Sequence, residues 1–151
     1  MNTLTLIRGL PGSGKSTQAI KLCAATKASW YEADMFFQYE DDYIFDPKLL
    51  KEAHNWCRAM TRADLARGMD VVVSNTFSTD WEIDLYLTVV QELNAALDVT
   101  ITVKIIELLD QFESEHDVPE HTIRNMAARW VHLDAPRFKK IQHVFLGNAT
   151  P

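Results

Sequence analysis

Residues 9–17 read G-L-P-G-S-G-K-S-T and follow a short apolar run, Leu4–Ile7. The pattern G-x-x-x-x-G-K-[ST], placed after a strand and before a stretch compatible with a helix, is the phosphate-binding loop, or P-loop. Its glycines let the backbone curl so that successive N–H groups point at phosphate oxygens where the helix begins. The motif requires a strand, a turn and a helix in this order, and it predicts that the chain binds a nucleoside triphosphate.

Two side chains of this motif have separate tasks. We expect the ammonium of Lys15 to reach the β- and γ-phosphates and the hydroxyl of Ser16 to ligate Mg²⁺. The residues expected to bind the nucleotide are Gly9, Pro11, Gly12, Ser13, Gly14, Lys15, Ser16 and Thr17. ATP and Mg²⁺ are therefore the expected cofactors.

The length and composition are those of one ordinary globular domain. The chain has 151 residues, of which 47% are hydrophobic and 24% are charged, and we expect one P-loop domain over residues 1–151. The net charge of −6 argues against broad, sequence-independent binding to nucleic acid, which needs a basic surface. The stretch 124–140 is nevertheless basic, which allows either a local anion site or a solvated helix face.

Nothing in the sequence indicates a membrane or a secretory pathway. No apolar run has the length of a membrane span, and the amino end lacks the features of a signal peptide. Cys23 and Cys57 match no metal or redox spacing, so we expect reduced thiols. These features predict no membrane partner and a cytoplasmic location, which is the host cytoplasm if the protein is viral.

The remaining sequence alternates between strand and helix patterns, which indicates a parallel sheet covered by helices on both faces. The expected strands are about 3–7, 29–32, 70–74 and 99–107, and the expected helices are 15–26, 47–68, 79–96, 119–130 and 135–144. The segment 35–45 has no clear period and is expected to be a loop. Helical spacing predicts one buried face for the second helix, formed by Leu49, Ala53, Trp56, Met60 and Ala63.

The predicted fold is thus α/β, a three-layer P-loop NTPase fold. Ligands of such folds bind outside the carboxyl ends of the strands. The first three strands end at Gly9, Asp34 and Asn75, which we expect at this edge.

The motifs of several other nucleotide-binding classes are missing. The sequence has no N-K-x-D element for reading guanine, and the run Val71–Val73 ends in Ser-Asn rather than in the aspartate of motor ATPases. A small phosphotransferase remains, and it needs a base beside the acceptor hydroxyl. Asp34 is the best candidate, although an aspartate here can also be a helix cap or a surface residue. Glu32 suits this role less well because it lies one step deeper on the same side of the strand.

Five segments together resemble the small P-loop kinases related to bacteriophage polynucleotide kinase. They read IRGLPGSGKST, EADMFF, AHNWC, VVVSNTFS and HDVPEHTIRNMAARW, and they cover nearly the whole chain. The resemblance implies that Asp34 activates the acceptor hydroxyl, that Lys15 binds phosphate, and that Ser16 and Asp34 lie at the metal. It also implies that the segment after Glu107, including residues 116–119, forms a short lid over the nucleotide.

The chain departs from that family at three places. The family has an arginine shortly after its strand-two aspartate, arginines in the lid before the V-P pair, and an aspartate at the end of strand three. At these places this chain has residues 35–38, residues 112–116 and Asn75. The two segments contain no arginine, and Asn75 carries no carboxylate. An arginine that stabilises the transition-state charge accelerates phosphate transfer by about 10³–10⁵. We expect Arg124 to take this role, ahead of Arg129. A surface salt bridge is the alternative role for Arg124.

Several acceptors of the phosphate are compatible with the sequence. Phe36, Phe37 and Tyr39 follow Asp34 and can stack on a base or fill the core, and His54 is a candidate acceptor contact. The leading hypothesis is a kinase for a hydroxyl on DNA or a nucleotide-like acceptor. That hydroxyl is either a 5′ end or the hydroxymethyl group of a base such as 5-hydroxymethyluracil, as in related phage kinases. A kinase for a small metabolite or nucleoside, and a non-catalytic ATP-binding switch, are the alternatives.

Overall fold

The computed structural model describes residues 2–112 and 118–147, and it contains one central sheet of parallel strands. The strands lie in the order β2-β5-β1-β6-β7. Their bounds are β1 Thr3–Arg8, β2 Ser29–Tyr31, β5 Val71–Asn75, β6 Thr102–Leu108 and β7 Gln142–Leu146. The helices are α1 Lys15–Thr26, α2 Leu50–Ala66, α3 Asp80–Leu97 and α4 Glu120–Ala128, with short 3-10 turns at Ala33–Phe37, Pro47–Leu49 and Pro136–Phe138. A small hairpin joins β3 Gln38–Tyr39 to β4 Asp42–Tyr43.

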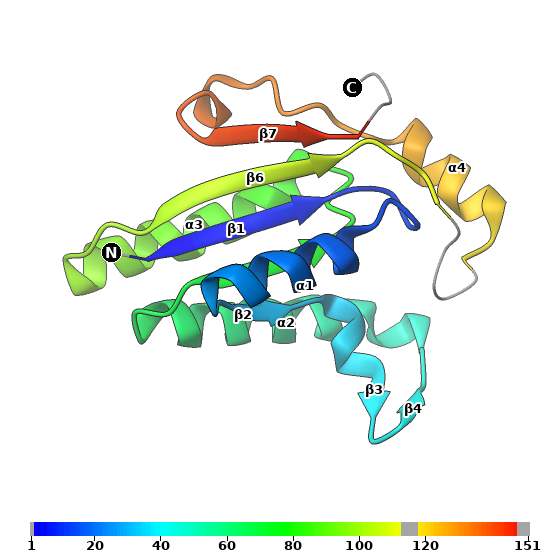
Figure 1. The fold of residues 1–151 in the computed structure, drawn as a ribbon, viewed down its shortest axis with the longest axis horizontal. Helices are drawn as coiled ribbons and strands as arrows, with labels where there is room; N and C mark the ends of the chain where they lie inside the picture. Colours follow the sequence, from blue (N-terminus) through cyan, green and yellow to red (C-terminus); the bar gives the residue numbers. More distant parts are fainter. Residues whose placement is uncertain (1, 113–117, 148–151) are drawn as a thin grey trace.

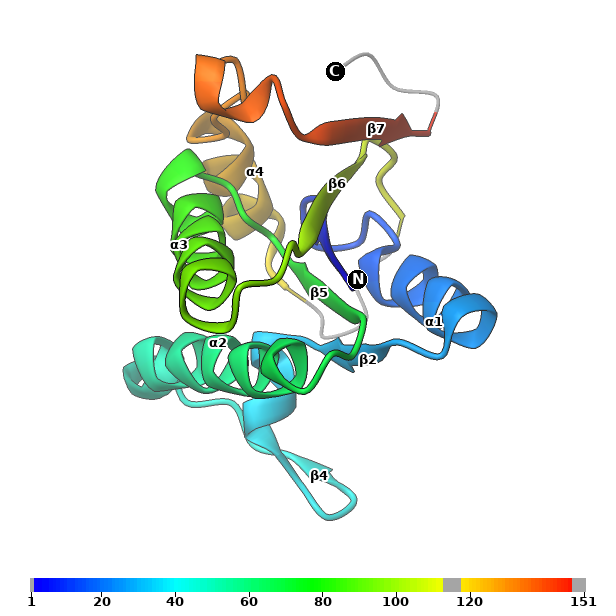
Figure 2. The ribbon, with the colours of Figure 1, turned by 90° about the vertical axis from the view of Figure 1, so that its left-hand side faces the viewer.

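The helices cover both faces of the sheet, which confirms the predicted three-layer α/β architecture. Figure 2 shows α1 on one face and α2 and α3 on the other. The strands point the same way, so their carboxyl ends share one edge, where Figure 1 shows the P-loop and α4. Within the described residues, no helix combines the length and the apolar character that crossing a membrane requires.

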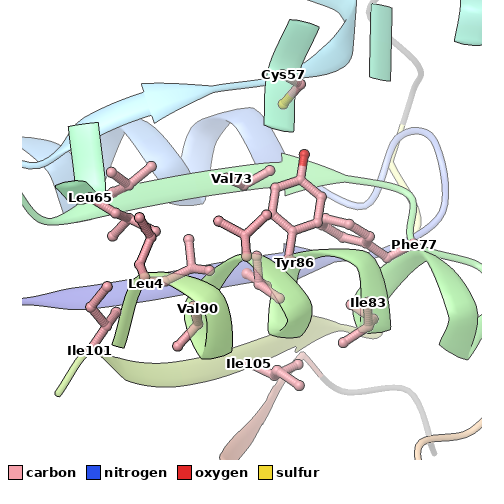
Figure 3. Packing of buried hydrophobic residues seen from close by; sticks show 14 of the residues in the cluster. Leu4, Cys57, Leu65, Val73, Phe77, Ile83, Tyr86, Val90, Ile101 and Ile105 are labelled. Carbon is pink, nitrogen blue, oxygen red and sulfur yellow. The ribbon is translucent and has the colours of Figure 1, made fainter. Parts of the chain in front are cut away.

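The larger core lies between the sheet and α2 and α3 (Figure 3). Leu4, Leu6, Val71 and Val73 point to this side, where they meet Tyr86 and other side chains of α3. Their neighbours on the same strands, Ile7 and Val72, point to α1. This alternation along a strand buried on both faces explains why β1 and β5 read as continuous apolar runs.

Local capping signals place two helix starts where the sequence predicts them. Asp46 accepts a hydrogen bond from the Lys48 backbone N–H at 3.0 Å, directly before Pro47. Thr79 and Glu82 form a capping box, in which the Thr79 backbone N–H donates to the Glu82 carboxylate at 3.0 Å. These contacts span two or three residues, so the sequence is sufficient to predict them.

The predicted buried face of α2 is confirmed at Ala53 and wrong at Leu49 and Ala63, which are exposed. Trp56 is partly buried against the core, and the buried residues of the helix are Ala53, Cys57, Thr61, Asp64 and Leu65. The face turns because Cys57 and Leu65 pack against the sheet core, and the backbone carbonyl of Cys57 satisfies the buried Thr61 hydroxyl at 2.8 Å.

The predicted last helix, 135–144, is also wrong. The 3-10 turn Pro136–Phe138 ends at once, and Gln142–Leu146 forms β7. This strand pairs with β6 in parallel, with Ile106 opposite Val144. Without β7, the edge of β6 would expose unpaired backbone groups, so pairing with a distant strand overrides the local pattern.

The segment 35–45 is more ordered than the predicted loop. It continues the 3-10 turn Ala33–Phe37 into the β3–β4 hairpin, which projects from the body in Figure 1. The hairpin is held to the turn by the Ile44 N–H, which donates to the Phe37 carbonyl at 2.9 Å.

Candidate active site

The P-loop connects the end of β1 to the start of α1 and has a backbone that suits an anion. Gly12 and Gly14 have φ of 83° and 93°, a region that favours glycine. The amino end of α1 begins at Gly14, and no acidic residue stands in its first turn. The free N–H groups and the helix dipole therefore remain available to a phosphate.

The nucleotide that this loop implies fits the residues present. The hydroxyl of Ser13 is buried and has no hydrogen-bond partner among the described residues. An unpaired buried hydroxyl in a phosphate loop is a group that a ligand oxygen can satisfy. A side chain on Gly12 would lie 2.5 Å from the Phe112 carbonyl oxygen, so the loop has room for backbone only at that point.

Lys15 lies folded back on its own loop, where its ammonium donates to the Leu10 carbonyl at 3.1 Å. Burial lowers the pKa of Lys15 to about 8, although the charges of Glu32 and Asp34 act in the opposite direction. Both carboxylates are thus within electrostatic range of the ammonium. A nucleotide phosphate would provide a much closer counter-charge for Lys15.

Glu32 contacts the P-loop serine Ser16, which the sequence pattern does not predict. Its Oε1 accepts a hydrogen bond from the Ser16 hydroxyl at 2.5 Å and another from the Ser74 hydroxyl at 2.7 Å. Ser74 in turn accepts from the Trp30 indole N–H at 2.8 Å. Burial raises the pKa of Glu32, and the two hydroxyl hydrogen bonds oppose that change. The structure therefore places a carboxylate directly on the P-loop serine.

Asp34 lies in the 3-10 turn after β2, at the carboxyl edge of the sheet. The turn is fixed by Asn75, whose side-chain oxygen accepts from the Ala33 backbone N–H at 2.9 Å. The Tyr43 hydroxyl donates to Asp34 at 3.1 Å. Burial and the charge of Asp34 raise the pKa of Tyr43 to about 12, so this phenol stays a donor near neutral pH. Asn75 thus fixes the backbone of the turn that carries Asp34.

The segment that follows β6, which is expected to form the lid, rests its first residues on the P-loop. The Phe112 backbone N–H donates to the Gly12 carbonyl at 2.5 Å, and the Gln111 amide donates to the Pro11 carbonyl. His116 and Asp117 of the expected lid lie outside the described residues. Helix α4 follows, and there Arg124 is exposed and pairs with Glu120 at 3.1 Å.

Arg8, the last residue of β1, connects the P-loop strand to both sides of the lid. It is fully buried and pairs with Glu107 of β6 at 3.1 Å. It also donates to the carbonyls of Phe77 and Val131, at 2.6 and 2.9 Å, and its guanidinium lies 4.0 Å from the centre of the Trp130 ring. These contacts hold the segment that returns from α4 against the end of the sheet.

The aromatic residues beside Asp34 have divided roles. Phe37 is buried, whereas Phe36 is 37% and Tyr39 is 67% exposed. His54 is half-buried, and burial lowers its pKa while the charges of Glu82 and, to a smaller extent, Asp34 oppose that change. Within the described residues there is no cluster of three or more His, Cys, Asp or Glu side chains fit to hold a metal ion by itself. Any Mg²⁺ here would therefore depend on the phosphates as well as on the protein.

The AAA domain family model (AAA_33) matches residues 4–133. The chain belongs to this family. Human NEDD4-binding protein 2 is 33% identical to this AAA domain over 91 residues, which are 59% of the chain and 5% of that protein. The chain therefore spans a small part of that relative.

Solved structures share the fold of this AAA domain at low sequence identity. A fungal RNA kinase has a TM-score of 0.66 and 13% identity, with 99% of this chain and 76% of that chain covered. A sugar kinase from Janibacter sp. HTCC2649 has a TM-score of 0.63 and 16% identity, with 97% and 85% covered. This AAA domain thus shares its fold with an RNA kinase and with a sugar kinase.

Proposed function

We propose that the protein is an ATP-dependent kinase that transfers the γ-phosphate to a hydroxyl group on DNA or on a nucleotide-like acceptor. The observation that carries this proposal is the common edge on which Lys15 of the P-loop and Asp34 of the neighbouring turn lie, within electrostatic range of each other. We also propose the cytoplasm as its location, because Cys23 and Cys57 are free thiols.

In this proposal Asp34 is the base. Its carboxylate accepts the proton of the acceptor hydroxyl while the acceptor oxygen attacks the γ-phosphorus. A new O–P bond forms, the bond from the γ-phosphorus to the bridging oxygen breaks, and ADP leaves. Lys15 and the P-loop N–H groups stabilise the phosphate charge, and bound Mg²⁺ would neutralise part of it. Arg124 of α4 is the proposed cation that stabilises the transition-state charge. To act there, it must leave Glu120 and bind the phosphates.

Two features support an acceptor with a base. Phe36 and Tyr39 follow Asp34 in the chain with exposed rings, and such rings can stack on a nucleobase. No cation stands in the residues that follow Asp34 as far as Lys48, so a clamp for an acceptor phosphate is missing there. The hydroxymethyl group of a modified base such as 5-hydroxymethyluracil therefore fits better than a 5′-hydroxyl strand end.

A small, uncharged metabolite is the second candidate acceptor, and the hairpin favours it. Glu40, Asp41 and Asp42 are exposed at the hairpin that follows Asp34. Their charges would repel a polyanionic strand and would leave a sugar or nucleoside unaffected.

The test compares acceptors and one variant. The wild-type protein, Mg²⁺ and γ-labelled ATP are incubated with hydroxymethylated DNA, with 5′-hydroxyl DNA, and with pools of nucleosides and sugars. We expect label on the hydroxymethylated DNA, and about 10²–10⁴-fold slower transfer by Asp34→Asn because the base is lost. ATP should bind this variant as it binds the wild type.

Asp98→Asn is the matched control, since it removes the same charge at an exposed position at the end of α3, away from Asp34. Label on sugars alone would transfer the proposal to the second candidate. ATP binding without label on any acceptor would instead indicate a non-catalytic nucleotide switch. Full activity in Asp34→Asn would exclude Asp34 as the base.

A further inference from the structure

The carboxylate that P-loop proteins place beside Mg²⁺ is missing from its usual strand in this chain. In P-loop NTPases the metal is held by the P-loop serine or threonine and by an aspartate that ends a hydrophobic strand. Here one neighbour of β1 in the sheet is β5, and it ends in Ser74 and Asn75. The strand on the other side, β6, carries Glu107 near its end, but this carboxylate pairs with buried Arg8.

A carboxylate from the next strand reaches the P-loop serine instead. Glu32 follows β2, one residue beyond the last ladder pair, Tyr31 with Val73 of β5. Its Oε1 accepts from the Ser16 hydroxyl at 2.5 Å. Among the described residues, this is the one carboxylate for which a hydrogen bond to the P-loop serine is found.

The position of Glu32 is fixed by a chain of hydrogen bonds across two strands. The Trp30 indole donates to the Ser74 hydroxyl at 2.8 Å, and Ser74 donates to Glu32 at 2.7 Å. The Ser74 hydroxyl, one residue before the end of β5, thus donates to the same Oε1 that accepts from Ser16, and it holds the Glu32 carboxylate toward the P-loop. A side chain that is aimed in this way needs little rearrangement to meet a ligand of Ser16.

We propose that Glu32 takes the role of the missing strand-end aspartate and helps to hold the Mg²⁺ that accompanies ATP, with Ser74 as its positioning residue. Mg²⁺ keeps several waters and is usually bound by one or two carboxylates together with substrate phosphates. One carboxylate beside the P-loop serine is consistent with that preference. In the absence of nucleotide, the same carboxylate keeps the Ser16 hydroxyl in place. The inference rests on the proposed binding of ATP with Mg²⁺, and it separates the metal residue from the base, Asp34.

The test measures metal binding without phosphate transfer. Mn²⁺, a paramagnetic substitute for Mg²⁺, is titrated into the complex of the protein with ADP and followed by electron paramagnetic resonance. The decisive variant is Glu32→Gln, because the amide oxygen can still accept from Ser16 and Ser74 while the charge is lost. We expect the affinity of the complex for Mn²⁺ to fall about 10–100-fold. The affinity for ADP in EDTA should not decrease.

Four further variants serve as controls for the Mn²⁺ affinity of Glu32→Gln. Glu32→Asp keeps the charge and should recover part of the affinity, and it also serves if Glu32→Gln does not fold. Ser74→Ala should weaken Mn²⁺ binding less than Glu32→Gln does, because it removes only the positioning hydroxyl. Asp34→Asn and Glu40→Gln should leave Mn²⁺ binding unchanged.

Unchanged Mn²⁺ affinity in Glu32→Gln would overturn the inference, and so would a loss confined to Asp34→Asn, which would assign the metal to Asp34. Neither result depends on whether the protein transfers phosphate to an acceptor. Failure of the proposed kinase activity, in contrast, would leave the Mn²⁺ affinities as expected here.

Discussion

Replacing Lys15 with methionine should make the nucleotide-free protein more stable. The ammonium of Lys15 is partly buried, and among the described residues its hydrogen bond is to the Leu10 carbonyl, so it has lost much of its hydration. This cost appears as the lowered pKa, about 8 against a usual value of 10.5. A methionine of similar length would fill the space without a charge to desolvate.

The size of the effect follows from the pKa. At about 1.4 kcal/mol for each pKa unit, the lowering of the Lys15 pKa from 10.5 to about 8 costs the folded protein roughly 3.5 kcal/mol near pH 7. This is an upper bound because Lys15 keeps some contact with water. The variant also loses the hydrogen bond to Leu10, worth about 1 kcal/mol. We therefore expect Lys15→Met to raise the free energy of unfolding by up to about 2.5 kcal/mol.

The pH dependence has a definite sign. Below about pH 8 the lysine is charged in both the folded and the unfolded chain, so the full cost is present. Between about 8 and 10.5 the unfolded chain holds a proton that the folded chain has released, so the stability of the wild type rises with pH. The advantage of Lys15→Met should therefore shrink through this window, and at about pH 9.5 it should have nearly disappeared.

Urea unfolding in EDTA, without nucleotide, measures this difference at the two pH values. Lys21→Met on the exposed side of α1 is the matched control and should change stability by less than about 0.5 kcal/mol. With ATP and Mg²⁺ present at about 100 times Kd, the wild type should gain about 2.7 kcal/mol, whereas Lys15→Met should gain little. A variant that is less stable than the wild type near pH 7, or an advantage that does not shrink with pH, would refute the argument from burial.

Two further predictions concern stability alone. Arg8→Met should lower the free energy of unfolding by about 3–5 kcal/mol, because it leaves the buried Glu107 carboxylate without its cation; urea unfolding measures this, and Arg8→Met combined with Glu107→Leu should recover part of the loss. Thr79→Ala should cost about 1 kcal/mol because it removes a side chain of the α3 capping box, and Thr79→Ser should cost much less. Equal losses for Thr79→Ala and Thr79→Ser in thermal unfolding would contradict this account of the cap.

The sequence predicts the parts of this protein that depend on neighbouring residues. The P-loop, the start of α1 at Lys15, and the capping box of Thr79 and Glu82 each lie within a few positions of the chain. The apolar runs of β1 and β5 are also legible, because a strand buried on both faces has few polar positions. These signals are sufficient for the α/β class and for the backbone of the P-loop.

The tertiary structure decides what depends on distant partners. Gln142–Leu146 becomes a strand because β6 offers an unpaired edge, which the local sequence does not record. Glu32 reaches Ser16 and Ser74, which are 16 and 42 residues away, and so the carboxylate beside the P-loop could not be chosen from strand alternation. One signal was present in the sequence, since β5 ends in Ser74 and Asn75 without a carboxylate.

The physical reason for this division is the range of the interactions. Caps, turns and phosphate loops are formed by backbone groups and side chains a few residues apart, so their free energy is local. Sheet order, the buried face of α2 and the contacts of Arg8 arise from burial and pairing between segments that meet only in the folded chain. The sequence by itself therefore determines that a polyphosphate can be held, and the fold determines which side chains surround it.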